Sequence, residues 1–266
     1  MNNYNHNNIR NIAIIAHVDH GKTTLVDQLL KKSETLDSRL DLEERAMDSN
    51  DLERERGITI LSKNTAIKYK DYKINILDTP GHADFSGEVE RIMMMVDGVV
   101  LVVDAYEGVM PQTRFVLKKA LESNLKPIVV INKVDKESAR CEQVIDEILD
   151  LFIELGATDE QADFKVAYVS ALKGTCSLSS DITTQKETMD PLLDLIISEI
   201  PAPDVDINGG LQFQGSLLDY NDYVGRMAIG RIRRGKVSQG EMVSCIRQDG
   251  SVKNFRVQKL YSFLGL

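Results

Sequence analysis

Residues 16–23, Ala-His-Val-Asp-His-Gly-Lys-Thr, have the residue types that hold a phosphate group. They follow an apolar run typical of a buried strand and precede a stretch with the apolar spacing of a helix. Backbone N–H groups at such a helix start point into one concave space and bind phosphate oxygens. Gly21 lets the backbone approach closely, Lys22 brings positive charge to the β- and γ-phosphates, and the Thr23 hydroxyl can ligate Mg²⁺. Ala16 stands where the usual phosphate-loop pattern has its first glycine. The alternative explanation is a chance Gly-Lys-Thr sequence on a surface loop.

A second motif, Asp-Thr-Pro-Gly-His at residues 78–82, follows another apolar stretch. The Asp78 carboxylate can hold Mg²⁺ through a water molecule. The backbone N–H of Gly81 can reach a γ-phosphate, so the segment that follows would respond to the nucleotide state. His82 comes directly after this sensor and can orient an attacking water molecule, although a lone histidine is more often structural.

The Asn-Lys-Val-Asp sequence at residues 132–135 also ends an apolar strand. The Asp135 carboxylate can accept both the N1–H and the exocyclic amino N–H of guanine. Adenine offers neither and would leave a buried carboxylate unpaired, so this residue favours guanine. The stem of Lys133 can lie over the base, and a backbone N–H in residues 170–172, Ser-Ala-Leu, can point toward the guanine O6 atom. Each motif is weak evidence alone, but their order, each at the end of a strand, predicts one guanine-nucleotide site.

A sheet must position these motifs, and the first 200 residues alternate apolar strands with helical patterns. The predicted strands are residues 9–16, 65–69, 73–77, 98–103, 127–131 and 165–169. The predicted helices are residues 23–32, 87–95, 113–123, 139–155 and 189–200. The short connection between the second and third strands predicts a hairpin. The whole pattern predicts an α/β fold, a P-loop NTPase domain with a mostly parallel six-stranded sheet, with all four motifs at one edge.

Two stretches interrupt this alternation. Residues 33–56 are dense in charge and contain no strand signal. They are typical of a solvated helix held by i,i+4 pairs or of a loop that becomes ordered on a ligand, and the two interpretations are compatible. Residues 174–187 are rich in Ser and Thr, and we expect a plain surface loop there.

A second domain is expected after residue 200. Residues 201–210 have the composition of a linker. Residues 211–266 contain four short alternating segments separated by turns, which is typical of a small antiparallel β-barrel, here a partial one. The predicted GTP-binding domain is therefore residues 1–200, and the predicted partial β-barrel domain is residues 211–266.

Charge is divided unevenly between these parts. The chain of 266 residues has a net charge of −9, but residues 211–266 hold nine Lys and Arg against four Asp and Glu. The local net charge is thus +5, against −14 for the remainder. The basic residues 211–266 could bind the phosphates of a nucleic acid. Basic residues on the solvated faces of strands would explain the charge equally well.

The composition limits the other function classes. The apolar share of 42% is ordinary for a globular protein, and no apolar run reaches the length of a membrane span. The Asn-rich residues 1–8 lack the apolar core of a signal peptide. Cys141, Cys176 and Cys245 have no metal-ligand spacing, so we expect reduced thiols, a cytoplasmic location and no membrane partner.

Longer strings carry a resemblance to a known family. Residues 56–60, Arg-Gly-Ile-Thr-Ile, together with the loop at residues 16–23 are similar to the translational GTPases. Residues 46–59, Ala-Met-Asp-Ser-Asn-Asp-Leu-Glu-Arg-Glu-Arg-Gly-Ile-Thr, resemble the TypA/BipA family of ribosome-associated GTPases, and residues 111–120 and 218–220 extend the match. The resemblance covers essentially the whole chain after the Asn-rich start.

The resemblance implies roles for further residues. Thr59 would ligate Mg²⁺ and sense the γ-phosphate, and Asp19 would assist a monovalent cation or the phosphates. Val18 and Ile58 would form an apolar gate between the catalytic histidine, His82, and the water. The expected metal ligands are Thr23, Thr59 and Asp78. The expected GTP-binding residues are Asp19, His20, Gly21, Lys22, Thr23, Thr24, Gly81, Asn132, Lys133, Asp135, Ser170, Ala171 and Leu172.

The activity implied by the resemblance is Mg²⁺-dependent hydrolysis of GTP to GDP and phosphate. The implied partner is the ribosome, through rRNA and ribosomal proteins, with tRNA as a further partner. The implied role is assembly of the large ribosomal subunit and adaptation to cold or stress. Away from the ribosome we expect a monomer.

Three alternatives remain open at this point. Members of the family continue with two further α/β domains and a distinctive C-terminal domain, whereas this sequence stops at Leu266, before the expected barrel is complete. The first is an elongation-type translation factor, which the absent domains would identify. The second is a nucleotide-gated binding module, which would bind GTP without productive turnover. The third is an inert remnant, which would not bind GTP at all.

Overall fold

The structure is a computed structural model that describes residues 5–32, 63–79, 86–221 and 224–264. Two compact units are present, and each is described by itself. One comprises the chain up to Pro203 together with Leu264, and the other extends from Asp204 to Phe263.

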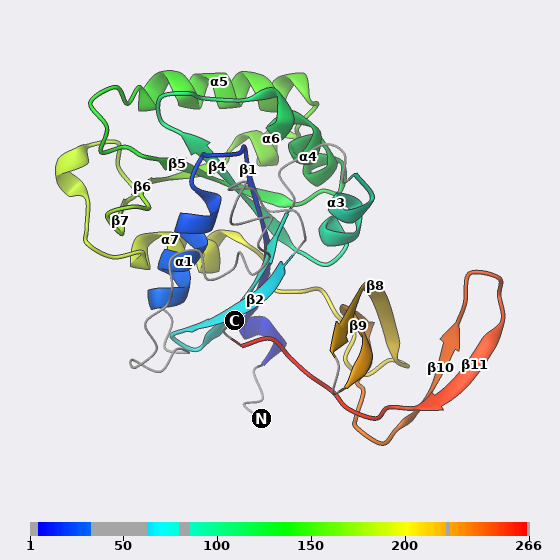
Figure 1. The fold of residues 1–266 in the computed structure, drawn as a ribbon. Helices are drawn as coiled ribbons and strands as arrows, with labels where there is room; N and C mark the ends of the chain where they lie inside the picture. Colours follow the sequence, from blue (N-terminus) through cyan, green and yellow to red (C-terminus); the bar gives the residue numbers. More distant parts are fainter. Residues whose placement is uncertain (1–4, 33–62, 80–85, 222–223, 265–266) are drawn as a thin grey trace. The chain divides into compact units, whose positions relative to one another are not determined.

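Seven strands form the sheet of the first unit, in the order β2-β3-β1-β4-β5-β6-β7 (Figure 1). The five central strands are parallel, and each edge strand, β2 or β7, is antiparallel to its neighbour. The strands are β1 (Ile9–Ala16), β2 (Lys63–Tyr69), β3 (Tyr72–Asp78), β4 (Gly98–Asp104), β5 (Lys126–Asn132), β6 (Lys165–Ser170) and β7 (Thr175–Ser177). The predicted mostly parallel sheet and the β2–β3 hairpin are confirmed, and the sheet has one strand more than the six predicted.

Helices cover both faces of this sheet. They are α1 (Lys22–Lys32), α3 (Ser86–Met93), α4 (Pro111–Glu122), α5 (Cys141–Glu154), α6 (Asp159–Ala162) and α7 (Asp190–Glu199), with short 3₁₀ turns η1 (His6–Asn8) and η3 (Ile182–Thr184). Figure 1 shows α1 and α7 together on one side of the sheet and α3, α4 and α5 on the other. In β1, Ile12 and Ile14 belong to the core cluster that α1 and α7 complete, and the intervening residues are buried as well. Burial on both faces explains why the central strands are almost continuously apolar.

The segment predicted as a plain surface loop, residues 174–187, contains β7 and η3, so that prediction was wrong. Cys176 is fully buried within the core cluster, and its backbone exchanges two hydrogen bonds with Lys186. One buried apolar residue among polar neighbours leaves no periodic signal in the sequence. Burial raises the pKa of the Cys176 thiol to about 12, which keeps it protonated.

The second unit consists of two antiparallel hairpins. One pairs β8 (Gln212–Asn221) with β9 (Gly225–Arg234), and the other pairs β10 (Met242–Ile246) with β11 (Val252–Arg256). The predicted antiparallel strands are confirmed. Within the described part of this unit they form two separate two-stranded sheets, and no ladder joins them into a continuous barrel.

Two expectations from composition can be compared with the described residues. Cys141, Cys176 and Cys245 are free thiols in this structure, and Cys176 is buried whereas Cys245 is exposed. Among the helices in the described part of the chain, none has the length and apolar character needed to cross a membrane.

Candidate functional site

The loop between β1 and α1 is shaped by its backbone. β1 ends at Ala16 and α1 begins at Lys22, so the predicted phosphate loop joins a buried strand to a helix N-terminus. Gly21 has φ +90°, and a Cβ there would lie 2.3 Å from the Asn132 Nδ2 atom. Asp19 has φ +65°, in the left-handed region that short polar residues tolerate. The sequence therefore needs glycine at position 21 for both conformation and space.

A buried ion pair joins this loop to the end of β3. The Lys22 Nζ atom lies 2.7 Å from the Asp78 Oδ1 atom, and both side chains are buried. Lys22 also donates to the Thr79 carbonyl oxygen, and the Thr79 hydroxyl donates to the Ile14 carbonyl oxygen at 2.7 Å. A buried ammonium needs an anionic partner. Asp78 is that partner here, and phosphate oxygens have the charge to replace it.

Asn132, at the end of β5, connects two of the predicted motifs. Its side-chain Nδ2 atom donates to the His20 carbonyl oxygen at 2.8 Å, and its Oδ1 atom accepts from the backbone N–H of Ala171 at 3.0 Å. The side chain is 1% exposed. One amide thus fixes the phosphate loop relative to the Ser-Ala-Leu turn after β6.

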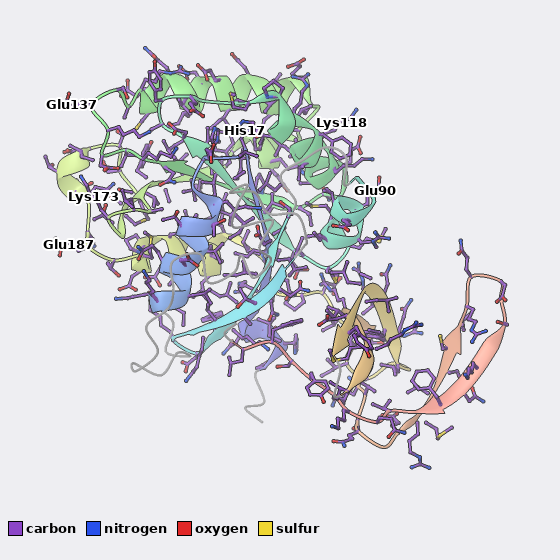
Figure 2. The ribbon with its side chains drawn as sticks, viewed as in Figure 1. His17, Glu90, Lys118, Glu137, Lys173 and Glu187 are labelled. Carbon is purple, nitrogen blue, oxygen red and sulfur yellow. The ribbon has the colours of Figure 1, made fainter. Side chains whose placement is uncertain are left out.

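The Asp135 carboxylate lies on the same edge of the sheet. The Lys173 Nζ atom is 3.2 Å from its Oδ2 atom, and Figure 2 labels this lysine. Burial alone would raise the pKa of Asp135, but hydrogen bonds from Ser170 and Lys173 outweigh it and lower the pKa. An ionised carboxylate that only accepts hydrogen bonds is what recognition of the guanine N–H groups requires.

His20 is a buried member of the phosphate loop. Its Nδ1 atom accepts from the backbone N–H of Asp104 at 3.3 Å, and its Nε2 atom lies 3.1 Å from the Glu107 carboxylate. Its ring packs edge-on against His17, labelled in Figure 2, with centroids 5.1 Å apart. Burial lowers the pKa of His20, and His17 lowers it further, against the opposite effect of Glu107 and Asp104. A neutral ring with its proton on Nε2 satisfies both contacts.

The described residues of the predicted site are not all equally enclosed. Leu172 is 83% exposed, whereas Ser170 and Ala171 are buried. Val18, Thr23 and Thr24 are half-buried. The predicted Ile58, Thr59, Gly81 and His82 lie outside the described residues. Sequence reasoning missed Lys173, Asp104 and Glu107, because their partners are distant in the chain.

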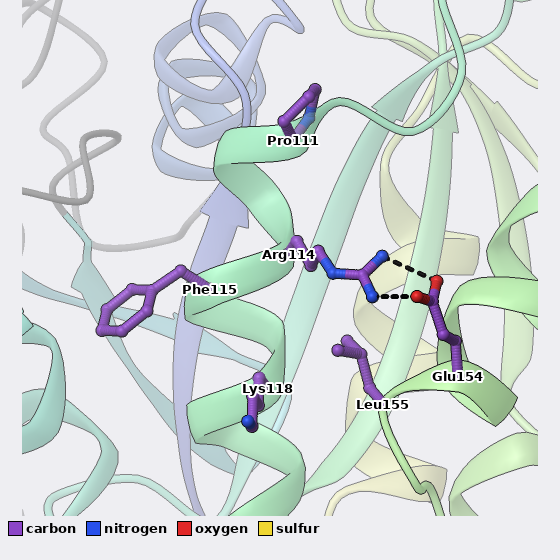
Figure 3. Close-up of a pocket in the computed structure, with 6 residues that line it drawn as sticks. All are labelled: Pro111, Arg114, Phe115, Lys118, Glu154 and Leu155. Atoms are coloured by element: carbon purple, nitrogen blue, oxygen red, sulfur yellow. Dashed lines mark hydrogen bonds and ion pairs between the residues drawn. The ribbon is translucent and has the colours of Figure 1, made fainter.

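A hollow elsewhere on the first unit contains none of the predicted site residues. It has a volume of about 340 Å³ and lies where α4 faces the end of α5. Figure 3 shows Arg114 and Glu154 paired through two hydrogen bonds across it. Its lining residues are Pro111, Arg114, Phe115, Lys118, Glu154 and Leu155.

Comparison with known proteins decides the family. The elongation factor Tu GTP binding domain family matches residues 7–202. The chain belongs to this family.

Relatives of the GTP binding domain family with curated names extend the match beyond residue 202. The chain is 66% identical over 260 residues to the large ribosomal subunit assembly factor BipA of Bacillus subtilis, which covers 98% of this chain and 42% of that protein. It is 61% identical over 259 residues to the factor of the same name in Salmonella typhimurium, with coverage of 97% and 42%. The resemblance to the TypA/BipA family is confirmed, and the chain spans about two fifths of the length of these relatives.

A solved structure supports the fold. The bacterial selenocysteine-specific elongation factor EF-Sec matches with a TM-score of 0.64 over 91% of this chain and 37% of that one. Sequence identity is 24%, so this similarity concerns the fold alone.

Proposed function

We propose that this chain binds GTP and GDP and hydrolyses GTP to GDP and phosphate. The observation that carries the proposal is the Asn132 amide, which bonds to His20 of the phosphate loop and to Ala171 of the Ser-Ala-Leu turn. Phosphate and base must be held at a fixed separation, and one buried side chain that bridges both loops provides this.

In this proposal each motif has a separate task. Residues 19–24, in and just after the phosphate loop, and Gly81 bind the phosphates. Lys22 would exchange its ion pair with Asp78 for contact with a phosphate oxygen. Asp135 reads the guanine edge, Lys133 covers the base, and the turn from Ser170 to Leu172 supplies a backbone N–H. His82 orients the attacking water, and Val18 and Ile58 restrict its approach.

Mg²⁺ dependence is part of the proposal. The residues that would hold the ion are Thr23, Thr59 and Asp78. Hydroxyl and carboxylate oxygens are the ligands that Mg²⁺ prefers, so the described Thr23 and Asp78 fit it chemically. When bound, the ion neutralises charge on the phosphate oxygens.

The domain arrangement follows the same proposal. Residues 1–200 act as the GTP-binding domain, residues 201–210 as a linker and residues 211–266 as part of a β-barrel domain. In the GTP state the γ-phosphate would contact the switch segments, residues 33–60 and 79–95, and hydrolysis would remove that contact and change affinity for a partner. Residues 33–60 and 80–85 lie outside the described residues, and Ser86–Met93 form α3 in this structure.

We infer that the partner is the ribosome, with rRNA and ribosomal proteins as contacts and tRNA as a further one. The role is assembly of the large subunit and adaptation to cold or stress, by a cytoplasmic protein that is monomeric off the ribosome. Two relatives carry the printed name of a large ribosomal subunit assembly factor, and the basic residues 211–266 suit RNA phosphates.

Nucleotide titration tests the core of the proposal. We expect GDP and GTP to displace a fluorescent GDP analogue from the chain, ATP to fail, and Mg²⁺ to strengthen binding of GTP. Equal displacement by ATP and GTP would contradict the assignment of the base site. Single-turnover hydrolysis with and without ribosomes then separates a GTPase from a binding module without turnover.

A further inference from the structure

Asp104 is a buried carboxylate that the four motifs do not explain. It is the last residue of β4, the strand between β1, which leads to the phosphate loop, and β5, which leads to Lys133. Its side chain is 1% exposed. Its Oδ1 atom accepts from the backbone N–H groups of Tyr106 at 2.7 Å and Glu107 at 3.3 Å. These bonds form a local Asx-type turn that fixes the carboxylate at the strand end.

The other carboxylate oxygen faces a lysine. The Lys133 Nζ atom lies 2.7 Å from the Asp104 Oδ2 atom, and Lys136 approaches the same atom at 3.8 Å. The Lys133 Nζ atom also donates to the Asp19 carbonyl oxygen at 2.6 Å. One ammonium therefore joins the end of β4 to the backbone of the phosphate loop.

The Asp104 carboxylate is held in its ionised form beside the Lys133 ammonium. Burial alone would raise the pKa of Asp104, but hydrogen bonds from Lys133 and from the backbone N–H groups of Tyr106 and Glu107 lower the pKa. Lys133 has φ +63°, in the left-handed region that residues other than glycine seldom adopt.

We propose that Asp104 is a positioning residue for guanine-nucleotide binding, because it holds the Lys133 ammonium against the Asp19 carbonyl before the nucleotide arrives. This inference rests on the proposed function, in which the Lys133 stem covers the base. A lysine side chain loses much rotamer freedom when it becomes ordered. If Asp104 orders it in the free protein, that entropy loss does not oppose binding. Without the carboxylate, Lys133 becomes ordered only with the nucleotide, which then leaves faster.

A double-mutant cycle tests the inference on the full chain. Asp104→Asn keeps the size and the acceptor for the backbone N–H groups but removes the charge. We expect this substitution to raise the GDP dissociation constant roughly tenfold, mostly through faster release. In a Lys133→Met background, where no ammonium remains to be held, Asp104→Asn should change GDP binding less than about twofold. Release of a fluorescent GDP analogue is followed by stopped flow, and thermal unfolding of each variant is recorded.

The matched control is Asp97→Asn, just before the opposite end of β4, where the Asp97 Oδ2 atom accepts from the Asn11 Nδ2 atom at 2.8 Å. This change should leave GDP release unaltered. An equal effect of Asp104→Asn in both backgrounds would overturn the proposal, since Asp104 would then act on the fold and not through Lys133. Unchanged GDP release in the Asp104→Asn chain would overturn it too.

The remaining outcomes separate folding, nucleotide binding and the role of Asp104. If Asp104→Asn does not fold, Asp104→Ser retains a short acceptor for the Tyr106 N–H and gives the same comparison. A wild-type chain that binds no guanine nucleotide would overturn the proposed function and this inference with it. A wild-type chain that binds GDP, with an Asp104→Asn variant that releases it at the same rate, would overturn this inference alone.

Discussion

At the scale of single residues, selectivity for the base depends on the Asp135 carboxylate. We expect Asp135→Asn to weaken GTP binding by about 2–4 kcal/mol, because the amide donates where the carboxylate accepted two charge-assisted hydrogen bonds. The preference should shift toward xanthosine triphosphate. Competition titrations with both nucleotides measure this, with Asp163→Asn, an exposed residue paired with Lys165, as the control. If the variant keeps the wild-type preference for GTP, Asp135 does not recognise the base.

His82 is expected to act on the attacking water and not on nucleotide affinity. His82→Ala should bind GTP almost normally, whereas ribosome-stimulated hydrolysis should fall by roughly two orders of magnitude or more. His6→Ala, in η1, is the control for loss of an imidazole away from the site. Normal turnover by His82→Ala on ribosomes would exclude His82 from the mechanism, and loss of GTP binding would make its role structural.

The buried His20 predicts a pH dependence of stability. Burial lowers the pKa of His20 in the folded protein, while the unfolded value is about 6.5. The unfolded chain therefore binds more protons just below pH 6.5, and the stability from neutral His20 is lost as pH falls from there through the folded pKa. Urea denaturation between pH 5 and 7.5 should show the free energy of unfolding decreasing toward acid pH. His20→Gln should flatten this slope, and an unchanged slope would show that other groups cause it.

The sequence identified candidate site residues in its motifs but not the neighbours that contact them. Lys22 and Asn132 belong to short spaced motifs whose chemistry is evident from residue type, and the structure brings them to one edge of the sheet. The contacts of Lys173 with Asp135 and of Asp104 with Lys133 depend on how separate loops pack. No local periodicity encodes such contacts, so only tertiary structure shows them.

At the scale of elements, strand and helix positions followed from periodicity because most elements here are long and strongly apolar on the buried side. β7 was missed because three residues with one buried cysteine are too short to give a pattern. Antiparallel strands after residue 210 were expected from short alternating segments separated by turns, and Gly250, in the turn between β10 and β11, has a positive φ.

The phosphate loop, as an element, should tolerate no side chain at position 21. In Gly21→Ala the new Cβ meets the Asn132 Nδ2 atom, and φ +90° is strained for alanine. We expect nucleotide affinity to fall by more than about tenfold and the free energy of unfolding by about 1–3 kcal/mol. Gly156→Ala is a matched control, since Gly156 has φ +78° but no atom within 4 Å of its Cβ position. It should lose some stability yet bind GDP normally; equal binding by both variants would contradict the role of Gly21.

At the scale of the whole molecule, the division of charge suggests how much of the partner affinity this chain carries. Residues 211–266 have a net charge of +5, and the chain spans 42% of the length of its BipA relatives. A protein that contacts its partner through several domains gains avidity, and a chain with only some of those contacts binds more weakly.

We therefore expect weak association with ribosomes that fades at moderate salt, and poor stimulation of GTP hydrolysis. A few phosphate contacts make the logarithm of affinity fall steeply with the logarithm of salt concentration. Co-sedimentation with ribosomes and a non-hydrolysable GTP analogue, across a salt series, measures this. Lys253→Gln combined with Lys259→Gln should weaken binding and reduce the salt slope by up to about two, whereas Lys126→Gln combined with Lys165→Gln in the first unit is the charge-matched control. Tight, salt-resistant binding by these 266 residues would contradict this expectation, since about two fifths of the relatives' length would then be sufficient for the main contacts.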